Sequence, residues 1–371
     1  MRVGVIGGGQ LARMMIPPAV ALGIELRVLA EVEGSSAALA ATAVGDYHDA
    51  ATVLAFASDV DVITFDHEHV PQAVLEALVA AGVAVHPGPH ALAVAQDKTL
   101  MRERLSAIGA PVPDWARVTD ADELGAFLAD HGGVAVVKTP RGGYDGKGVR
   151  VVRAASDADD WFASAGAEGL LVEQFVPFRR ELAQLVARRP SGQIAAWPLV
   201  ETVQRDGVCA EVFAPAPHAG ALADEARALA ERIATELDVT GVLAVELFET
   251  DEGRLLVNEL AMRPHNTGHW SIDGAITSQF EQHLRAVLDL PLGDPTPLAP
   301  VSVMVNILGG PSGERMPGRY ARVMADRPEV KLHSYAKDSR PGRKVGHVTA
   351  TGDSLDDTVA RARAAAAFFE G

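Results

Sequence analysis

The chain has 371 residues, which is too many for one compact core and indicates two or three packed subdomains. Its formal net charge is −16, so its overall field repels nucleic acid and anionic membranes, and an anionic substrate would need a local basic pocket. Cys209 is the single cysteine and no apolar run reaches 18 residues, so we expect no intrachain disulfide, no membrane span and a cytoplasmic location.

The first predicted element is a strand at residues 2–6, which a glycine turn at 7–9 joins to a helix beginning at Gln10. Pro17 and Pro18 are expected to break or kink that helix, because proline lacks the backbone donor and its ring clashes with the preceding turn.

Further strands are predicted at 26–29 and 60–65, with Ala-rich helical segments between them. Strands that alternate with helices indicate a parallel α/β sheet, here a first domain of residues 1–95. The segment 7–12 also fits the G-x-G-x-x-A dinucleotide fingerprint, with Glu31 near the end of the second strand. A nicotinamide oxidoreductase is therefore an alternative, although nothing later in the sequence supports it.

A small lobe is predicted at residues 112–172, after a helix that Asp97 can cap and a proline-rich joint. Within it, the segment 138–148 (KTPRGGYDGKG) lies between two predicted strands, so it is not a Walker loop, which joins a strand to a helix. A glycine-rich hairpin can close over a triphosphate and offer backbone N–H groups, and Lys138 and Lys147 add positive charge. The alternative is a mobile surface hairpin with exposed lysines.

Two acidic side chains occur in a second predicted hairpin. Glu246 and Glu259 lie in apolar strands that a turn at 250–253 joins, so they should face each other or be offset by one residue. Two facing carboxylates repel unless a cation lies between them, and Mg²⁺ favours such oxygen ligands together with substrate phosphates. The alternative is a pair of unrelated, solvent-facing acids.

The segment 263–269 (RPHNTGH) has neither helical nor strand periodicity and indicates a functional loop. A helix is predicted at 278–288, with Ser278 and Glu281 as a capping box, and a linker follows at 290–300. The C-terminal unit, 296–371, contains a cationic cluster that suits a phosphate monoester, with a solvated charged turn as the alternative. This cluster contains Lys337, Arg340, Arg343 and Lys344.

Together and in this order, these motifs resemble the 5-(carboxyamino)imidazole ribonucleotide synthases, an ATP-grasp family of ligases in purine biosynthesis. The similarity runs along nearly the whole chain, and its most specific string is NELAMRPHNTGHW followed by SQFEQH. The resemblance implies an α/β ATP-grasp fold with an N-terminal parallel-sheet domain, an ATP-grasp domain at 96–290 that includes the lid lobe, and a C-terminal α+β unit. It also implies a homodimer that uses ATP and Mg²⁺ to carboxylate 5-aminoimidazole ribonucleotide with bicarbonate through carboxyphosphate.

The family's functional roles carry over to matching positions of this sequence. Arg263, Lys138 and Asn258 would be catalytic, and Glu246 and Glu259 would hold the metal. The nucleotide would contact Lys98, Lys138, Gly143, Tyr144, Asp145, Gly146, Lys147, Gly148, Val149, Glu173, Gln174, Phe175, Val176, Glu181, Gln204, Asn258 and Glu259. The ribonucleotide would contact Gln10, Leu11, Glu68, His265, Asn266, Lys337, Arg343 and Lys344.

Three positions depart from the family's pattern. Asp66 stands where the family often has Glu, and Gln204 stands where it has His, which puts a nucleotide contact there in doubt. Pro17-Pro18 is unusual in the first helix. Two further alternatives are a formate-dependent glycinamide ribonucleotide transformylase, against which the RPHNTGHW and SQFEQH strings argue, and a non-catalytic nucleotide sensor.

Overall fold

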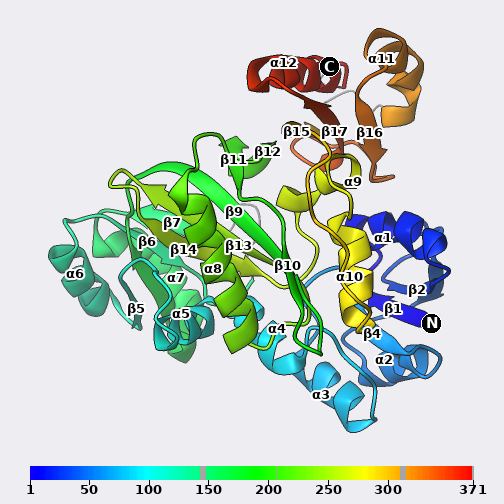
Figure 1. Ribbon diagram of the computed structural model, residues 1–371. Coiled ribbons are helices and arrows are strands. Elements are labelled where there is room, and N and C mark those ends of the chain that lie inside the picture. Colours follow the sequence, from blue (N-terminus) through cyan, green and yellow to red (C-terminus); the bar gives the residue numbers. More distant parts are fainter. Residues whose placement is uncertain (143–147, 206, 310–314, 370–371) are drawn as a thin grey trace.

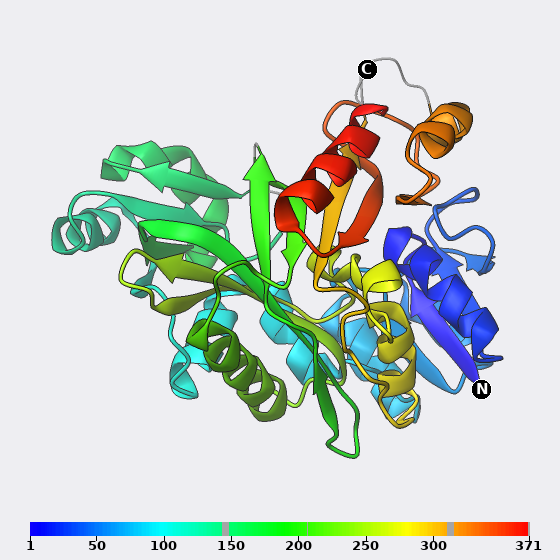
Figure 2. The ribbon, with the colours of Figure 1, turned by 45° about the horizontal axis from the view of Figure 1, so that its top comes forward.

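The computed structural model describes residues 1–142, 148–205, 207–309 and 315–369. Within these residues the strands form three sheets. Figures 1 and 2 show the N-terminal domain (blue) and the C-terminal unit (red and orange) on one side of the molecule, with the small lobe (teal) at the opposite end. The large sheet lies between them.

The N-terminal domain is a parallel sheet with strand order β3-β2-β1-β4, as the alternating pattern predicts. Its strands are β1 Arg2–Ile6, β2 Glu25–Ala30, β3 Ala41–Val44 and β4 Val62–Phe65, and its helices are α1 Gln10–Ala21, α2 Ala50–Ala57 and α3 Gln72–Ala80. The sheet is thus built around β1, at whose carboxyl end the glycine turn begins.

The prediction that Pro17 and Pro18 break the first helix is wrong, since α1 runs through both prolines to Ala21. The backbone N–H of Leu22 still donates to the carbonyl of Pro18, at 3.0 Å, so helical bonding resumes directly after them. Met15 and other buried residues of α1 pack in one apolar cluster with Phe280 and Leu284 of a later helix. This tertiary packing offsets the roughly 3 kcal/mol that a proline costs inside a helix.

Two consecutive helices, α4 Pro89–Gln96 and α5 Lys98–Ala107, lead out of this domain. Asp97 caps α5, as predicted, because its carboxylate accepts hydrogen bonds from the N–H groups of Thr99 and Leu100.

The lid lobe is a small antiparallel sheet, in the order β5-β8-β6-β7, with helices on it. Its elements are β5 Trp115–Val118, α6 Ala121–Asp130, β6 Ala135–Lys138, β7 Val149–Val152, η1 Ala155–Ala158, α7 Asp159–Ala165, η2 Gly166–Glu168 and β8 Leu170–Gln174. Lys138 pairs with Val149, so the two strands that flank the glycine-rich segment form the predicted hairpin. Residues 143–147 lie outside the described part of the chain.

The large sheet runs without interruption from the ATP-grasp region into the C-terminal unit, in the order β14-β13-β9-β11-β12-β15-β17-β16. Its first part contains β9 Phe178–Arg188, β10 Ile194–Ala196, β11 Val200–Arg205, β12 Val208–Ala214, β13 Gly241–Thr250 and β14 Leu255–Ala261. The C-terminal unit adds β15 Val301–Leu308, η4 Met316–Arg319, α11 Tyr320–Asp326, β16 Lys331–Ser334, β17 Lys344–Gly352 and α12 Leu355–Ala367. Backbone pairing of β12 with β15 therefore fixes the C-terminal unit to the central sheet.

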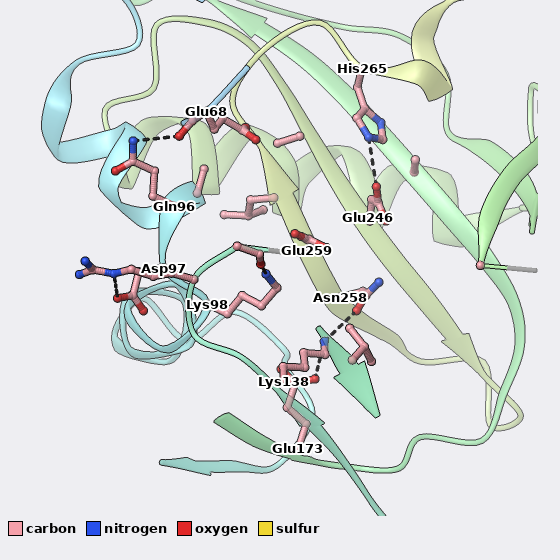
Figure 3. A pocket seen from close by; sticks show the side chains of 18 of the residues that line it. Glu68, Gln96, Asp97, Lys98, Lys138, Glu173, Glu246, Asn258, Glu259 and His265 are labelled. Carbon is pink, nitrogen blue, oxygen red and sulfur yellow. Dashed lines mark hydrogen bonds and ion pairs between the residues drawn. The ribbon is translucent and has the colours of Figure 1, made fainter. Parts of the chain in front are cut away.

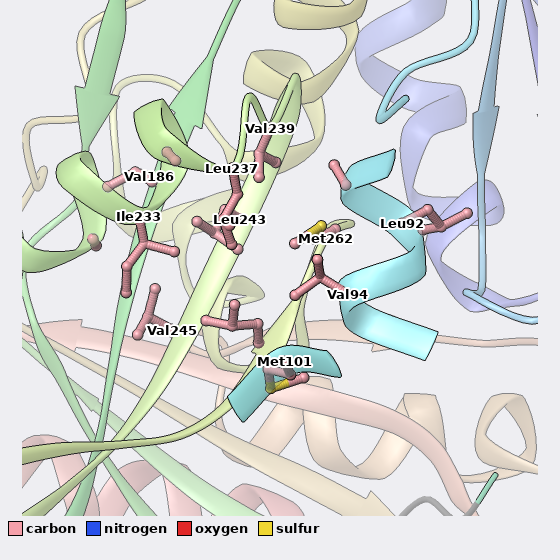
Figure 4. Packing of buried hydrophobic residues seen from close by; sticks show 14 of the residues in the cluster. Leu92, Val94, Met101, Val186, Ile233, Leu237, Val239, Leu243, Val245 and Met262 are labelled. Carbon is pink, nitrogen blue, oxygen red and sulfur yellow. The ribbon is translucent and has the colours of Figure 1, made fainter. Parts of the chain in front are cut away.

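Helix α8, Ala221–Glu236, covers one end of this sheet. Its Ile233 packs with Leu243 and Val245 of β13, and the same core continues to Val94 and Met101 of α4 and α5 (Figure 4). Burial of these side chains holds the helices that follow the N-terminal domain against the central hairpin.

Helix α10, Gln279–Val287, follows η3 Asn266–Gly268 and α9 Ser271–Gly274. Ser278 caps it as predicted, accepting from the N–H of Glu281 at 3.2 Å. The other half of the predicted capping box is replaced, because the Glu281 carboxylate forms an ion pair with Arg285 one turn later. Among the described residues, no helix is both long and apolar enough to cross a membrane.

Candidate active site

A cavity of about 1030 Å³ opens where the lid lobe, the central sheet and the C-terminal strand β17 meet. Its walls also include the segment after β4 and the loop after β14. Many of the predicted site residues line it: Glu68, Lys98, Lys138, Val149, Glu173, Gln174, Phe175, Val176, Glu181, Gln204, Glu246, Asn258, Glu259, Arg263, His265, Asn266 and Lys344. The fold thus brings residues from distant parts of the sequence to one site.

Glu246 and Glu259 are direct partners across the β13–β14 hairpin, as predicted. The register shifts at this point, so that Leu247 pairs with Val257 and Asn258 becomes an extra residue in its strand. A β-bulge of this kind changes the direction in which the side chains of the strand point. Asn258 and Glu259, although consecutive, therefore both line the cavity (Figure 3).

The two carboxyl groups have different electrostatic surroundings. Burial and the neighbouring charge of Glu246 raise the pKa of Glu259, an effect that Lys98 and Lys138 partly oppose. Burial also disfavours the charge on Glu246, but the hydrogen bond from His265, with the charges of Lys344 and Arg263, holds the pKa of Glu246 below its ordinary value. Glu246 is thus the carboxylate that this site stabilises in the charged form.

This donor set fits Mg²⁺. Two hard carboxylates face each other, and burial together with the charge of Glu246 raises the pKa of Glu259, so a cation between the two would be favourable. Within the described residues, no group of three or more His, Cys, Asp or Glu side chains could hold a metal ion alone. Mg²⁺ commonly completes its shell with water and substrate phosphates, so a two-carboxylate site suits a metal that arrives with a nucleotide.

Two lysines reach the cavity beside the hairpin. Lys138, at the end of β6, has its Nζ 2.7 Å from Glu173 Oε2 and 3.4 Å from Asn258 Oδ1 (Figure 3). Lys98, the first residue of α5, donates to the carbonyl of Gly142 at 3.0 Å. A strand and a helix thus place the two lysines next to the acidic pair. Nucleotide phosphates that bind a metal ion at this pair would lie within reach of both lysines.

The sequence analysis missed Arg102, which contacts the same group. Its Nε donates to Glu173 Oε1 at 2.6 Å and its Nη2 donates to the backbone carbonyl of Asn258 at 2.6 Å. The side chain of Glu173 therefore lies buried between two cations, beside its role as one of the nucleotide contacts that the family resemblance implies.

Apolar side chains of the central sheet and the lid lobe line one part of the cavity. Phe178 and Phe248 stack with ring centroids 4.5 Å apart, and Phe175 and Val149 remain exposed beside them. Such a surface suits a flat base. Gln204, one of the departures from the family pattern, donates to Glu181 Oε2 at 3.0 Å, so it lies next to another predicted nucleotide contact.

The loop after β14 forms another part of the cavity wall. His265 Nε2 lies 3.2 Å from Glu246 Oε1, and Arg263 Nε lies 3.4 Å from Glu68 Oε2. The side-chain amides of Asn266 and Asn306 hydrogen-bond to each other in both directions, at 3.0 and 2.7 Å. The loop is therefore tied to the acidic pair, to the N-terminal domain and to β15.

Gln279 is a second residue that the sequence analysis did not single out. Its Oε1 accepts from the N–H of His265 at 2.8 Å, and its Nε2 donates to the His265 carbonyl at 2.7 Å and to His269 Nδ1 at 2.8 Å. Its side chain is completely buried. Two bonds from one amide fix the backbone from which the His265 imidazole reaches Glu246, and the third ties that amide to the ring of His269.

Several predicted contacts do not line this cavity: Gln10, Leu11, Gly148, Lys337 and Arg343. Leu11 is buried in the core of the N-terminal domain, while Lys337 hydrogen-bonds to Gln10 across the boundary with the C-terminal unit. Arg343 donates to the carbonyl of Asp338 at 3.4 Å, so it diverges from its neighbour Lys344. Gly143, Tyr144, Asp145, Gly146 and Lys147 lie outside the described residues.

The glycine turn at residues 7–9 packs against side chains of its own domain. A Cβ on Gly9 would lie 2.0 Å from the Asp66 carboxylate, whose other oxygen accepts from the N–H of Ala12. Glu31 accepts from the N–H of Gly8 at 3.2 Å, and its hydrogen bond with His67 lowers the Glu31 pKa to about 2. The glycines thus allow close packing against Asp66, which gives them a role without a dinucleotide.

Three family models match consecutive parts of the chain. They are the ribonucleotide synthetase preATP-grasp domain at residues 1–96, the ATP-grasp domain at 103–280 and the phosphoribosylaminoimidazole carboxylase C-terminal domain at 302–361.

Whole proteins match along nearly their full length. The N5-carboxyaminoimidazole ribonucleotide synthase of Mycobacterium tuberculosis is 53% identical, with 98% of this chain and 86% of that protein covered. The synthetase structure from Thermus thermophilus has a TM-score of 0.87 at 39% identity, with 97% of each chain covered. The Aspergillus clavatus synthase, solved with ADP and 5-aminoimidazole ribonucleotide, has a TM-score of 0.89 at 30% identity and covers 99% of this chain and 98% of its own. This agreement in sequence, fold and domain order confirms the resemblance drawn from the motifs: the chain belongs to the N5-carboxyaminoimidazole ribonucleotide synthases, ATP-grasp ligases of purine biosynthesis.

Proposed function

We propose that this enzyme carboxylates 5-aminoimidazole ribonucleotide by phosphorylating bicarbonate with ATP and passing the carboxyl group of carboxyphosphate to the exocyclic amine. ADP and phosphate are the other products. Bicarbonate is a poor electrophile, and phosphorylation gives it a leaving group. The observation that carries this proposal is the cavity that joins a carboxylate pair, two lysines and an arginine to an apolar wall.

The nucleotide lies between the lid lobe and the central sheet. Its base contacts the wall of Phe175, Phe178 and Phe248, and Glu181 accepts from the ribose. Lys98 and Lys138 contact the phosphates, where their charge offsets the repulsion that the acidic pair would otherwise exert.

Glu246 and Glu259 hold Mg²⁺, with Asn258 beside them. When bound, the metal ion neutralises charge that develops on the transferring phosphoryl group. Pairing of β13 with β14 places the two carboxylates opposite each other. His265 and Lys344 help to keep Glu246 ionised.

Arg263 stabilises carboxyphosphate as it forms, because its guanidinium lies in the cavity wall beside the acidic pair. The ribonucleotide lies toward the N-terminal domain, where Glu68, His265 and Asn266 contact it and Lys344 binds its phosphate. These roles agree with the loop's attachment to the N-terminal domain through the Arg263–Glu68 contact.

The experiment is to supply ATP, bicarbonate and 5-aminoimidazole ribonucleotide to the purified enzyme and follow ADP release. ADP release that depends on the ribonucleotide and on bicarbonate supports the reaction. Release that depends instead on formate and glycinamide ribonucleotide favours the transformylase, and nucleotide binding without turnover favours a sensor. We also propose a cytoplasmic homodimer, which sedimentation of the purified chain tests for its oligomeric state.

A further inference from the structure

Arg102 carries a guanidinium buried in the protein interior. It lies in the second turn of α5, and 1% of the residue is exposed. Burying a charge is costly unless it is paired and hydrogen-bonded. Arg102 is paired with Glu173 of the lid lobe and donates to the carbonyl of Asn258 in the β13–β14 hairpin, each at 2.6 Å, while its Nη1 has no hydrogen-bond partner among the described residues. One side chain therefore connects three elements of the nucleotide site.

Glu173 is shared between two cations. One of its oxygens accepts from Arg102 and the other lies 2.7 Å from the ammonium of Lys138. Although burial opposes the charge on Glu173, the charges of Arg102 and Lys138 keep its pKa below the ordinary value. One carboxylate and two cations leave this cluster with a net charge of about +1 at the edge of the cavity.

We propose that Arg102 is a positioning residue for the nucleotide: by neutralising Glu173, it leaves the charge of Lys138 available to the phosphates. The inference rests on the proposed function, in which Lys138 contacts those phosphates. Without Arg102, Glu173 and Lys138 form a neutral pair, because no other cation of the described residues lies within ion-pair distance of Glu173.

Arg102 has a second effect through the backbone. Its bond to the Asn258 carbonyl lies at the bulge that directs both Asn258 and Glu259 into the cavity. The guanidinium donates in two directions from a fixed plane, which an ammonium cannot reproduce. The charge of Arg102 thus supports nucleotide affinity, and its geometry supports the orientation of the metal ligands.

The test separates these effects with Arg102→Met, Arg102→Lys, Glu173→Gln and the double variant Arg102→Met/Glu173→Gln. Arg104→Met is the matched control, because Arg104 is exposed on the same helix. Calorimetry gives the Kd for ADP with Mg²⁺ and without ribonucleotide, and ADP release gives kcat. Thermal unfolding of each variant reports whether it folds.

Arg102→Met should raise the Kd for ADP about ten- to a hundredfold, the equivalent of losing one charge-assisted hydrogen bond. The double variant should return the Kd to within about threefold of wild type, because Lys138 again has no neutralising carboxylate. Arg102→Lys should keep the Kd within about threefold and lower kcat, since it retains the charge and loses the second bond.

An unchanged Kd in Arg102→Met, or a double variant that binds ADP no better than Arg102→Met, would overturn the inference. If Arg102→Met does not fold, Arg102→Lys keeps the test decisive, because a folded lysine variant with strongly weakened ADP binding contradicts the charge argument. A wild-type enzyme that binds ADP yet gives no ribonucleotide-dependent turnover would refute the proposed function instead. The Kd values of the variants for ADP would still test the role of Arg102 in nucleotide binding.

Discussion

Glu246 and Glu259 lie directly opposite each other across the β13–β14 hairpin, and their pKa values are shifted in opposite directions. His265 accounts for much of this difference, because its Nε2 lies 3.2 Å from Glu246 Oε1, whereas Glu259 forms no ion pair with any described residue. The pair therefore combines one carboxylate that a histidine stabilises in its charged form with one whose charge is disfavoured by burial and by its neighbour.

Substitution of the less stabilised carboxylate tests the metal assignment. Glu259→Gln should reduce ADP release by at least about a hundredfold, because it removes a charge that balances Mg²⁺ near the transferring phosphoryl group. The half-buried amide should leave the fold intact, which thermal unfolding and circular dichroism check. Near wild-type turnover at limiting Mg²⁺ would show that Glu259 is not a metal ligand.

Gln279→Leu should lower kcat about tenfold or more, because the His265 backbone loses two hydrogen bonds and its imidazole is no longer held against Glu246. The Km of this variant for ATP should change little, because the hydrogen bonds of the Gln279 side chain go to His265 and His269 and not to the residues proposed to contact the nucleotide. Gln282→Leu is a matched control. Gln282 is equally buried on the same helix and also exchanges two hydrogen bonds with a loop, at Gly293, outside the site. Equal losses of kcat in both variants would indicate a general packing effect.

The C-terminal cations should contribute unequally to ribonucleotide binding. Lys344 lines the cavity, and its substitution by Ala should raise the Km for 5-aminoimidazole ribonucleotide about ten- to a hundredfold, the effect of one charge-assisted bond. Arg343→Ala should have a smaller effect because its guanidinium contacts the Asp338 carbonyl. The Km for ATP, measured on the same variants, should stay near wild type. A larger effect of Arg343→Ala would place the phosphate outside this cavity.

His283 should make the protein less stable in mild acid. It is fully buried, accepts from the N–H of Val242 at 3.1 Å, and contacts Thr64 Oγ1 at 2.7 Å, so it joins α10 to β13 and β4. Burial, together with the charge of His86, lowers its pKa to about 3. The unfolded chain takes up a proton below about pH 6.5, whereas the native state does not, so stability is complete above that pH and falls as the pH decreases.

Proton uptake by His283 in the unfolded chain should by itself lower the free energy of unfolding by about 2 kcal/mol between pH 6.5 and pH 5. Urea unfolding at the two pH values measures the change, and His283→Asn should remove that part of it. Replacement of the exposed His48 by Asn should leave the pH dependence as in wild type. If His283→Asn shows the full wild-type dependence, other groups cause the loss of stability.

The sequence by itself determined the local elements and much of the chemistry. Alternation of apolar strands and helices predicted the parallel N-terminal sheet, and the turn after Glu249 predicted the hairpin in which Glu246 faces Glu259, because both depend on short-range patterns. The cap at Asp97 was predictable for the same reason. The order of motifs identified the family without any knowledge of how its parts are arranged.

Tertiary structure decided the features that depend on contacts between distant segments. Packing against α10 allowed α1 to continue through Pro17 and Pro18, which local propensity could not indicate. Pairing of β12 with β15 made the C-terminal unit part of the central sheet, and only this arrangement directed Lys344 into the cavity and left Arg343 outside it.

Arg102 and Gln279 were missed for the same physical reason. Glu173 lies 71 residues along the chain from Arg102, and Gln279 reaches the His265 backbone across a folded loop. Neither set of contacts leaves a local pattern in the sequence, so the roles of both side chains exist only once the chain has folded.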